Sequence, residues 1–328
     1  MPPQTDNPYA DFLKELHDKS FTTDEEIAEL IHEASGLYPA SKKRLMTGEV
    51  NEVYDVELPE KGNVIIRIHK SEKPIFLQEK WAIDECRKLD IPVPTILLIK
   101  HIPQGDEVVS FCIQEKLPGD TLERGKVPYE QVDKGQAKTL FNKAGGILEK
   151  MHSIPVSGFG NLDGTGKGDK PSFQEEMTRE TEKEEKYMAL AKKLGIPDGQ
   201  MAKAFRTLRE RVPKYADVKP TFNHGDFAPK HIMYVGDKVT GILDFGDVLS
   251  HAPIYDFARW EYWYGDDEKL TWLKEGYSDK SIFADSEELS RLIQLYMNLG
   301  IIKWYDTQGY QHGVEEGVEK MGALLKDF

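Results

Sequence analysis

Short runs that alternate apolar and polar residues dominate the first third of the chain and predict a small sheet. They are rich in β-branched and aromatic residues and are separated by turn residues, as strands are. A turn at 59–62 lies between the second and third runs, which is typical of antiparallel neighbours. The runs are RLMTGEV at 44–50, NEVYDVEL at 51–58, NVIIRIHK at 63–70, TILLIK at 95–100 and VVSFCIQEKL at 108–117.

Helical periodicity is found before, within and after this predicted sheet. At 24–35 apolar residues recur on one face, with Thr23 and Glu26 in capping-box spacing and Gly36 as the C-terminal stop. The segment 74–89 carries a second apolar face, and the segment 140–151 a third. Residues before about 21 show no clear period, so we expect them to form a loosely docked arm.

The second half of the chain is mainly helical in pattern. The segment 152–173 is rich in glycine and polar residues and predicts a long surface loop. Its glycines do not follow a strand, so they do not indicate a dinucleotide-binding turn. The segment 173–194 predicts an acidic helix, either a solvated face or a wall that binds a polycation. Together these patterns predict an α+β fold with the sheet first and the helices after it.

The stretch TFNHGDFAPKHIMYVGDKVTGILDFGD at 221–247 concentrates the side chains with chemical potential. Its runs 232–235 and 239–243 predict two strands joined by a Gly-Asp turn. With that turn, Val235 faces Lys238 and His231 faces Ile242. Asp244 then lies two residues further on, an offset of about 7 Å at a rise of about 3.3 Å per residue.

The same stretch places a third group nearby. Asp226 precedes His231 by five residues, so Asp226, His231 and Asp244 are expected at one edge of the hairpin. Phosphoryl transfer uses such a set: one carboxylate orients the attacking hydroxyl and others hold the magnesium ion. Two alternatives are a plain turn capped by Asp226 and a zinc site made by His224, His231 and His251. The three histidines lack the close pairs of typical zinc motifs.

The order HGDFAPKH, ILDFGD and YDFA resembles the aminoglycoside phosphotransferase and choline kinase family, whose members are relatives of protein kinases. The resemblance implies that Asp226 is the catalytic base and Asp244 a ligand of Mg²⁺. The usual Asn at the other metal position is His231 here, as in the aminoglycoside 2″-phosphotransferase branch. The motifs are nearest to that branch and to the hygromycin B phosphotransferases. His224 and Asp256 would support the catalytic loop.

The resemblance also assigns residues of the predicted sheet to nucleotide binding. Arg67 lies within VIIRI, where kinase-like folds place the cation that contacts the phosphates, and Glu79 is its expected partner, with Glu85 as the second choice. Gly48 and Asn51 would form a lid over the phosphates. A plain β-meander with Arg67 in solvent is the alternative.

Two further groups of residues follow from the same resemblance. The run Gln114, Glu115, Lys116 and Leu117 falls where the family's hinge binds the purine through backbone groups, which leaves ATP and GTP both open as the donor. Acceptor-site candidates near the motif are Asp247, Glu261, Tyr262 and Trp263, with simple packing as the alternative for the last three.

Composition narrows the partners and the compartment. With 39% apolar residues and 33 aromatic residues in 328, the chain is long and apolar enough for two folded lobes. A net charge of -14 makes nucleic acid and anionic membranes poor partners and favours a small cationic molecule. Only Cys86 and Cys112 are present, and neither a signal peptide nor a long apolar run is visible, so we expect a soluble cytoplasmic protein.

The sequence therefore predicts a protein-kinase-like two-lobe fold, with a nucleotide-binding lobe at 1–115 and a catalytic, substrate-binding lobe at 116–328. The expected reaction moves the γ-phosphate of ATP or GTP, with Mg²⁺, to a hydroxyl of a small cationic or polyol molecule. An aminoglycoside or hygromycin-type antibiotic is the first expectation for the acceptor. A kinase of an amine alcohol or sugar is the second, and a nucleotide-binding pseudokinase without turnover is the third.

Overall fold

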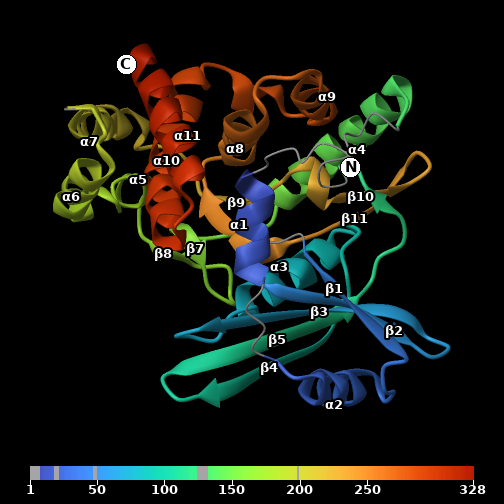
Figure 1. Cartoon of the computed structure of the whole chain (residues 1–328). Coiled ribbons are helices and arrows are strands. Elements are labelled where there is room, and N and C mark those ends of the chain that lie inside the picture. The colour runs from blue at the N-terminus through green and yellow to red at the C-terminus, as the bar shows by residue number, and fades with distance from the viewer. Residues whose placement is uncertain (1–7, 18–21, 47–49, 124–131, 198) are drawn as a thin grey trace, which may run out of the picture.

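The computed structural model describes residues 8–17, 22–46, 50–123, 132–197 and 199–328, and it has two lobes. The smaller lobe, at the bottom of Figure 1, is built on one sheet, and the larger lobe above it is mainly helical. This is the expected α+β architecture. The predicted division of the chain at 115/116 stays a prediction.

The small lobe holds a five-stranded antiparallel sheet in the order β1-β2-β3-β5-β4. Alternate residues of β2 are buried, because one face of the sheet lies against the core and the other side chains point away from it. Four of the predicted strands are present, and the first, predicted at 44–50, is replaced by a strand that ends at Leu45, while residues 47–49 lie outside the described residues. The bounds of the strands are β1 (Ser41–Leu45), β2 (Glu52–Leu58), β3 (Gly62–Ser71), β4 (Ile96–Gln104) and β5 (Glu107–Glu115).

Helix α2 (Asp24–Ser35) covers the outer face of this sheet (Figure 1). Its Ile27 and Ile31 are fully buried in one cluster with Val56 and Ile66 of the strands. The predicted capping box is confirmed: the Thr23 side chain accepts from the Glu26 N–H while the Glu26 carboxylate accepts from the Thr23 N–H. The predicted stop at residue 36 is also confirmed, by a left-handed glycine with φ 77°.

Helix α3 (Leu77–Lys88) joins the two lobes on the inner face of the sheet. Its Ala82, Ile83 and Cys86 are buried in the core cluster of the large lobe and not in the cluster under α2. The helix therefore carries Glu79, in its first turn, to the boundary between the lobes.

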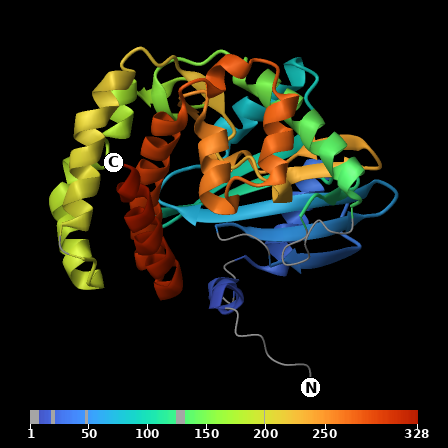
Figure 2. The same cartoon turned by 90° about the horizontal axis from the view of Figure 1, so that it is seen from above.

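The large lobe is a helical assembly around one core. Figure 2 shows α6 and α7 as an outer layer beyond α10 and α11. Its helices are α4 (Lys134–His152), α5 (Phe173–Met177), α6 (Glu184–Leu194), α7 (Gln200–Arg211), α8 (Tyr255–Tyr264), α9 (Glu268–Gly276), α10 (Glu287–Gln308) and α11 (Gln311–Leu324). Short 3₁₀ turns are η2 (Thr181–Lys183), η3 (Val212–Tyr215), η4 (Pro229–His231), η5 (Phe245–Asp247), η6 (Lys280–Phe283) and η7 (Leu325–Asp327).

Two small sheets lie within this lobe, one in the order β11-β10-β6 and one in the order β8-β7-β12-β9. The expectation of a long surface loop at 152–173 is wrong, because Phe159 and Leu162 of β7 are buried in the core. The expected single acidic helix at 173–194 is broken into α5, η2 and α6. The strands are β6 (Asp120–Thr121), β7 (Phe159–Leu162), β8 (Gly168–Lys170), β9 (Thr221–Asn223), β10 (Ile232–Val235), β11 (Lys238–Ile242) and β12 (Leu249–His251).

The predicted catalytic hairpin forms, but its register differs by one residue beyond the turn. Val235 pairs with Lys238 as expected. A β-bulge between Met233 and Tyr234 then shifts the pairing. A bulge adds one residue to one strand and so changes which residues face each other.

This shift corrects the position expected for His231. It does not face Ile242, which pairs with Ile232; instead, the Leu243 N–H donates to the His231 carbonyl at 2.9 Å. Asp244 therefore lies one residue beyond the position opposite His231, closer than predicted.

The N-terminal segment is not a loosely docked arm. Residues Pro8–His17 form helix α1, and Phe12 is 8% exposed. Its ring stacks on Tyr310 at 4.5 Å and meets Trp304 edge-on at 6.5 Å. The aromatic contacts with the C-terminal helices hold α1 against the large lobe, which the short and irregular pattern of this segment did not reveal.

Cys86 and Cys112 are both buried and free. In the described part of the chain, no helix has the length and apolar character needed to cross a membrane.

The capping box gives a stability prediction. Thr23→Ala removes the side-chain acceptor for the Glu26 N–H and is expected to lower the free energy of unfolding by about 1 kcal/mol. Thr23→Ser keeps a hydroxyl at the cap, so its free energy of unfolding should lie within a few tenths of a kcal/mol of the wild-type value. Urea denaturation of the three proteins measures the difference, and equal losses for both variants would contradict the role of the hydroxyl.

Candidate active site

The catalytic loop at 224–231 is held by a buried carboxylate from α8. Asp256 is 1% exposed and accepts hydrogen bonds from the His224 N–H at 2.9 Å and the Gly225 N–H at 2.8 Å. His152 Nε2 lies 3.2 Å from the same carboxylate. Because backbone groups are fixed this way, the loop keeps its shape regardless of which side chains react. The structure thus brings Asp256 to the loop that it was predicted to support.

His224 is fully buried behind the loop. Its Nδ1 accepts from the Asp226 N–H at 3.2 Å, so its Nε2 carries the proton and donates to the Leu243 carbonyl at 3.0 Å. Burial lowers the pKa of His224, which keeps the ring neutral for this pair of contacts. The ring therefore ties the loop before Asp226 to the chain before Asp244, in line with its predicted supporting role.

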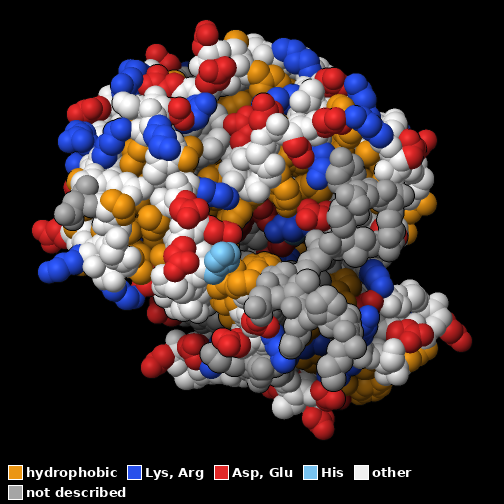
Figure 3. All heavy atoms as spheres, turned by 45° about the horizontal axis from the view of Figure 1, so that its top comes forward, with side chains coloured by type: hydrophobic (Ala, Val, Ile, Leu, Met, Phe, Trp, Pro, Cys, Tyr) orange, Lys and Arg blue, Asp and Glu red, His pale blue; other side chains and the backbone are white. Residues whose placement is uncertain are grey.

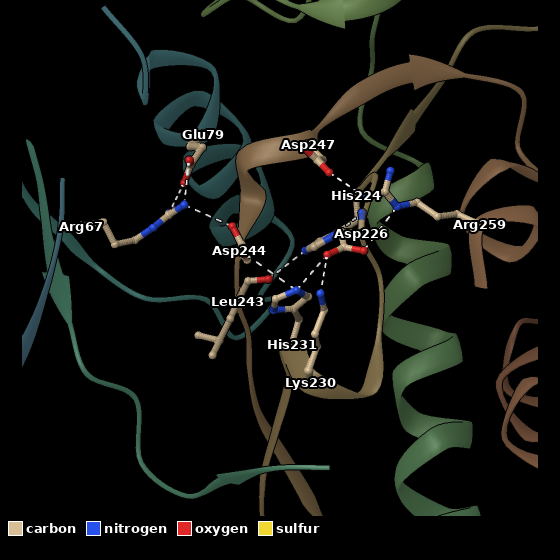
Figure 4. A network of polar contacts seen from close by, with 10 residues as sticks. All are labelled: Arg67, Glu79, His224, Asp226, Lys230, His231, Leu243, Asp244, Asp247 and Arg259. Atoms are coloured by element: carbon tan, nitrogen blue, oxygen red, sulfur yellow. Dashed lines mark hydrogen bonds and ion pairs between the residues drawn. The ribbon is translucent and has the colours of Figure 1, made fainter. Parts of the chain in front are cut away.

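Asp226 is surrounded by groups that can carry positive charge (Figure 4). One oxygen lies 3.0 Å from His231 Nε2 and 3.2 Å from Lys230 Nζ, and the other lies 3.3 Å from Arg259 Nε. Burial alone would raise the pKa of Asp226, but the His231 hydrogen bond and the Arg259 and Lys230 charges hold it well below its ordinary value. The carboxylate is ionised at neutral pH.

A second cluster joins the two lobes. Arg67, in the middle of β3, donates to both oxygens of Glu79 at 2.5 and 3.2 Å, and its Nη2 also donates to Asp244 at 3.1 Å. Arg67 is 8% exposed and Glu79 is 2% exposed. Burial works against the charged form, but Glu79 and Asp244 raise the pKa of Arg67, so it stays charged. The structure pairs Arg67 with Glu79, the first predicted partner, rather than with Glu85.

Asp244 occupies an unusual backbone conformation between these clusters. Its φ of 64° and ψ of 73° lie in the left-handed region, which costs a residue other than glycine of the order of 1–3 kcal/mol. The conformation directs one oxygen toward Arg67 and places the other 3.8 Å from His231 Nε2. A strained carboxylate at the point where the lobes meet is typical of a functional position.

The expected convergence of Asp226, His231 and Asp244 is therefore present, although the three do not form a closed metal cage. Within the described ranges, no three His, Cys, Asp or Glu side chains are arranged to hold a metal ion, which also removes support from the alternative zinc site. The two ionised carboxylates do fit Mg²⁺, which prefers oxygen and takes one or two carboxylates with phosphate and water. His231 is engaged with Asp226 and fits this ion less well.

Arg259 is the main site residue that the sequence analysis missed. Its Nη2 donates to Asp247 at 2.8 Å while its Nε contacts Asp226, so it bridges the catalytic loop and the DFGD segment. The available signal was its place on α8, three residues after Asp256 and thus on a neighbouring face of the helix. The run YDFARWEYWY also carries Asp256 and Glu261, so the sequence alone does not indicate which of its charged side chains meets the site.

A cavity of about 270 Å³ opens beside this bridge. Figure 3 shows the hollow between the lobes with acidic and basic side chains in its depth. The lining includes residues from both lobes and is mostly polar. The polar members are Gln78, Asn161, Asp247, Tyr255 and Arg259.

Three of the four predicted acceptor residues lie elsewhere. Glu261 pairs with Lys274 at 2.9 Å and accepts from Ser290 and Gln294, so it serves α8, α9 and α10. Tyr262 is 6% exposed and Trp263 stands beside Lys320 at 4.9 Å. None of these three residues lines the cavity, and Trp263 is 37% exposed, so their acceptor role stays a prediction. Asp247 does line it.

The remaining nucleotide-site predictions are placed as follows. Gly48 lies outside the described residues. Asn51 directly precedes β2, and its buried Oδ1 has no hydrogen-bond partner in the described structure. The run 114–117 leaves the end of β5, and its members Gln114, Glu115, Lys116 and Leu117 stay predictions for purine contact.

A two-lobe fold with paired carboxylates on a loop and hairpin, and with a buried Arg–Glu pair from the other lobe, defines a kinase-type phosphotransferase of small molecules. A model of the phosphotransferase enzyme family matches residues 43–280, more than half of the chain. The chain belongs to the phosphotransferase enzyme family. This agrees with the family resemblance seen in the sequence. No curated protein matches the sequence.

Solved structures confirm the protein-kinase-like fold. Aminoglycoside phosphotransferase APH(4)-Ia is similar with a TM-score of 0.73 at 14% identity, over 93% of this chain and 99% of that chain. The gentamicin complex of APH(2″)-IIa is similar with a TM-score of 0.64 at 16% identity, over 92% and 97%. The GDP and kanamycin complex of APH(2″)-IIIa gives 0.60 at 15% identity, over 92% and 98%. At such identities the likeness shows the fold.

The close packing of Gly225 gives a prediction. It has φ 84°, and a Cβ there would lie 1.9 Å from the Asp247 carbonyl oxygen. Gly225→Ala is therefore expected to lower the free energy of unfolding by the cost of a left-handed alanine plus about 1–3 kcal/mol for overpacking. Gly309→Ala is the matched control, since Gly309 has φ 73° and open space around its Cβ. Urea denaturation of both variants separates the two costs, and equal losses would contradict the predicted clash.

Proposed function

We propose that this enzyme transfers the γ-phosphoryl group of a nucleoside triphosphate, ATP or GTP, to a hydroxyl of a small molecule. The observation that supports the proposal best is the meeting of Asp226, His231 and Asp244 at the point where the buried Arg67–Glu79 pair arrives from the other lobe. Phosphoryl transfer depends on positioning and charge stabilisation, which such a set supplies.

The donor would lie between the lobes. Arg67 is proposed to contact its phosphates, with Glu79 fixing the direction of the guanidinium. The backbone of 114–117 is proposed to bind the purine. Related folds support a nucleotide here, because solved complexes of APH(4)-Ia contain AMP-PNP or ADP and one of APH(2″)-IIIa contains GDP.

Mg²⁺ is proposed to be held by Asp244, with His231 as the second group that the family motif suggests. Bound there, the ion would neutralise charge on the phosphates. Asp226 is proposed to accept the hydrogen bond of the acceptor hydroxyl and then its proton. Arg67 would balance the charge of Asp244, and the backbone contacts of Asp256 would keep Asp226 in place.

The acceptor is proposed to be an aminoglycoside or hygromycin-type antibiotic, with resistance as the consequence. Solved structures similar to this chain contain hygromycin B, gentamicin or kanamycin, which supports this class. An amine alcohol or sugar is the second candidate. The cavity of about 270 Å³ favours this second class, because it lies just below the range of about 300–1,000 Å³ that is usual for ligand pockets and so suits a small acceptor.

The decisive assay combines the purified protein, Mg²⁺, ATP or GTP, and a panel of hygromycin B, kanamycin, gentamicin, glucosamine and choline. We expect phosphorylation of at least one acceptor, detected by mass spectrometry. Nucleotide binding without transfer to any of them would favour the pseudokinase instead.

Asp226→Asn tests the catalytic assignment. An amide cannot take up the hydroxyl proton, so turnover should fall by roughly 10²- to 10⁴-fold, with the nucleotide Kd changed less than about 2-fold. Asp237→Asn, in the exposed turn between β10 and β11, is the control and should match the wild type. Retained turnover in Asp226→Asn would show that another group performs this role.

A further inference from the structure

Arg259 forms a fork between two carboxylates from separate segments. Its Nε lies 3.3 Å from Asp226 Oδ1 and its Nη2 lies 2.8 Å from Asp247 Oδ2. Its side chain is 22% exposed, that of Asp226 is 18% exposed and that of Asp247 is 57% exposed. The bridge therefore begins at the partly buried reacting carboxylate and ends at one that is open to solvent.

The same side chain forms part of the cavity wall. Of the residues that line the cavity, Arg259 is the one with a hydrogen bond to Asp226 in the described structure. Gln78 and Asn161 line the cavity from α3 and β7, and Tyr255 lines it one helical turn before Arg259. A molecule in the cavity would thus touch the guanidinium that also holds Asp226.

The other nitrogen groups in contact with Asp226 do not share this arrangement. Lys230 is half exposed and reaches Asp226 with a single flexible ammonium group. His231 contacts the opposite oxygen and faces Asp244. Arginine differs from both because its planar donors can hold two acceptors in a fixed geometry.

We propose that Arg259 is a positioning residue for phosphoryl transfer: by bridging Asp226 and Asp247 it sets the orientation of Asp226 toward an acceptor that enters the adjacent cavity. This inference rests on the proposed function. The proposed nucleotide contacts, Arg67 and Glu79, form no hydrogen bond or ion pair with Arg259 in the described structure. Loss of the bridge should consequently act on transfer to the acceptor and leave the nucleotide alone.

The experiment uses the full chain and the panel acceptor that the wild type phosphorylates fastest. Arg259→Gln is expected to lower kcat by roughly 10- to 100-fold, the size of effect that a misplacement of about 1 Å produces, while the nucleotide KM changes less than about 2-fold. The ratio of acceptor phosphorylation to nucleotide hydrolysis should fall too, because water does not depend on the cavity. A purely structural role would lower acceptor phosphorylation and nucleotide hydrolysis together, through the loss of folded protein, and would leave their ratio unchanged.

Two companion variants sharpen the result. Arg259→Lys keeps the charge without the fork and should recover only part of kcat, whereas full recovery would overturn the bridging role. Arg211→Gln removes an arginine that contacts Glu288 between α7 and α10, and it should match the wild type in every constant. The melting temperature of each variant shows whether it is folded. If Arg259→Gln does not fold, Arg259→Lys serves as the test.

The outcomes separate the two proposals. If the wild type phosphorylates no acceptor, the proposed function is wrong and the role of Arg259 is wrong with it. If the wild type is active and Arg259→Gln has the same kcat and the same ratio of transfer to hydrolysis, only the role of Arg259 is wrong.

Discussion

The contacts of Arg67 with Glu79 and Asp244 are the interactions on which the site depends most. They join a strand of the sheet, a helix on the inner face of that sheet and the segment that follows the hairpin of the other lobe. Removing one partner of the buried Arg67–Glu79 pair leaves an uncompensated buried charge, which typically costs about 3–5 kcal/mol. The contact with Asp244 crosses between the lobes, and because the Asp244 side chain is 45% exposed, this contact is weaker than the buried pair. A guanidinium fixed by Glu79 thus meets an aspartate of the large lobe at the proposed phosphate site.

Backbone contacts carry the rest of the precision. Asp256 fixes two successive N–H groups of the catalytic loop, and the missing Cβ of Gly225 lets that loop approach Asp247. These interactions involve no reacting side chain, so acidic and basic groups can be placed close together without distorting the loop. The unfavourable backbone conformation of Asp244 is tolerated because contacts with the surrounding structure hold the residue in place.

The sequence was informative where chemistry depends on local spacing. The capping box at Thr23, four of the five strands and the meeting of Asp226 with His231 all follow from residues near one another in the chain. It was uninformative where the outcome depends on distant packing. Thr240, the extra residue of the bulge in β11, donates to the distant Pro118 carbonyl, and the burial of Phe12 on Tyr310 and the partner choice of Arg259 also involve neighbours far away in sequence. Glu261 shows the limit of nearness in sequence to the motif, since its side chain contacts Lys274 of α9 and Ser290 and Gln294 of α10.

The contacts around Asp226 also bear on how it would act. A carboxylate in contact with His231, Lys230 and Arg259 is strongly held in its ionised form, so it is a weak base. A weak base contributes little by removing a proton early, but it can fix the direction of a hydroxyl through a hydrogen bond. Phosphoryl transfer has little need of a strong base, because bond formation to the nucleophile lags behind departure of the leaving group. The electrostatics of the site therefore favour a proposed order in which Asp226 first orients the hydroxyl and takes up its proton late, so that the geometry of the neighbours of Asp226 matters for the rate.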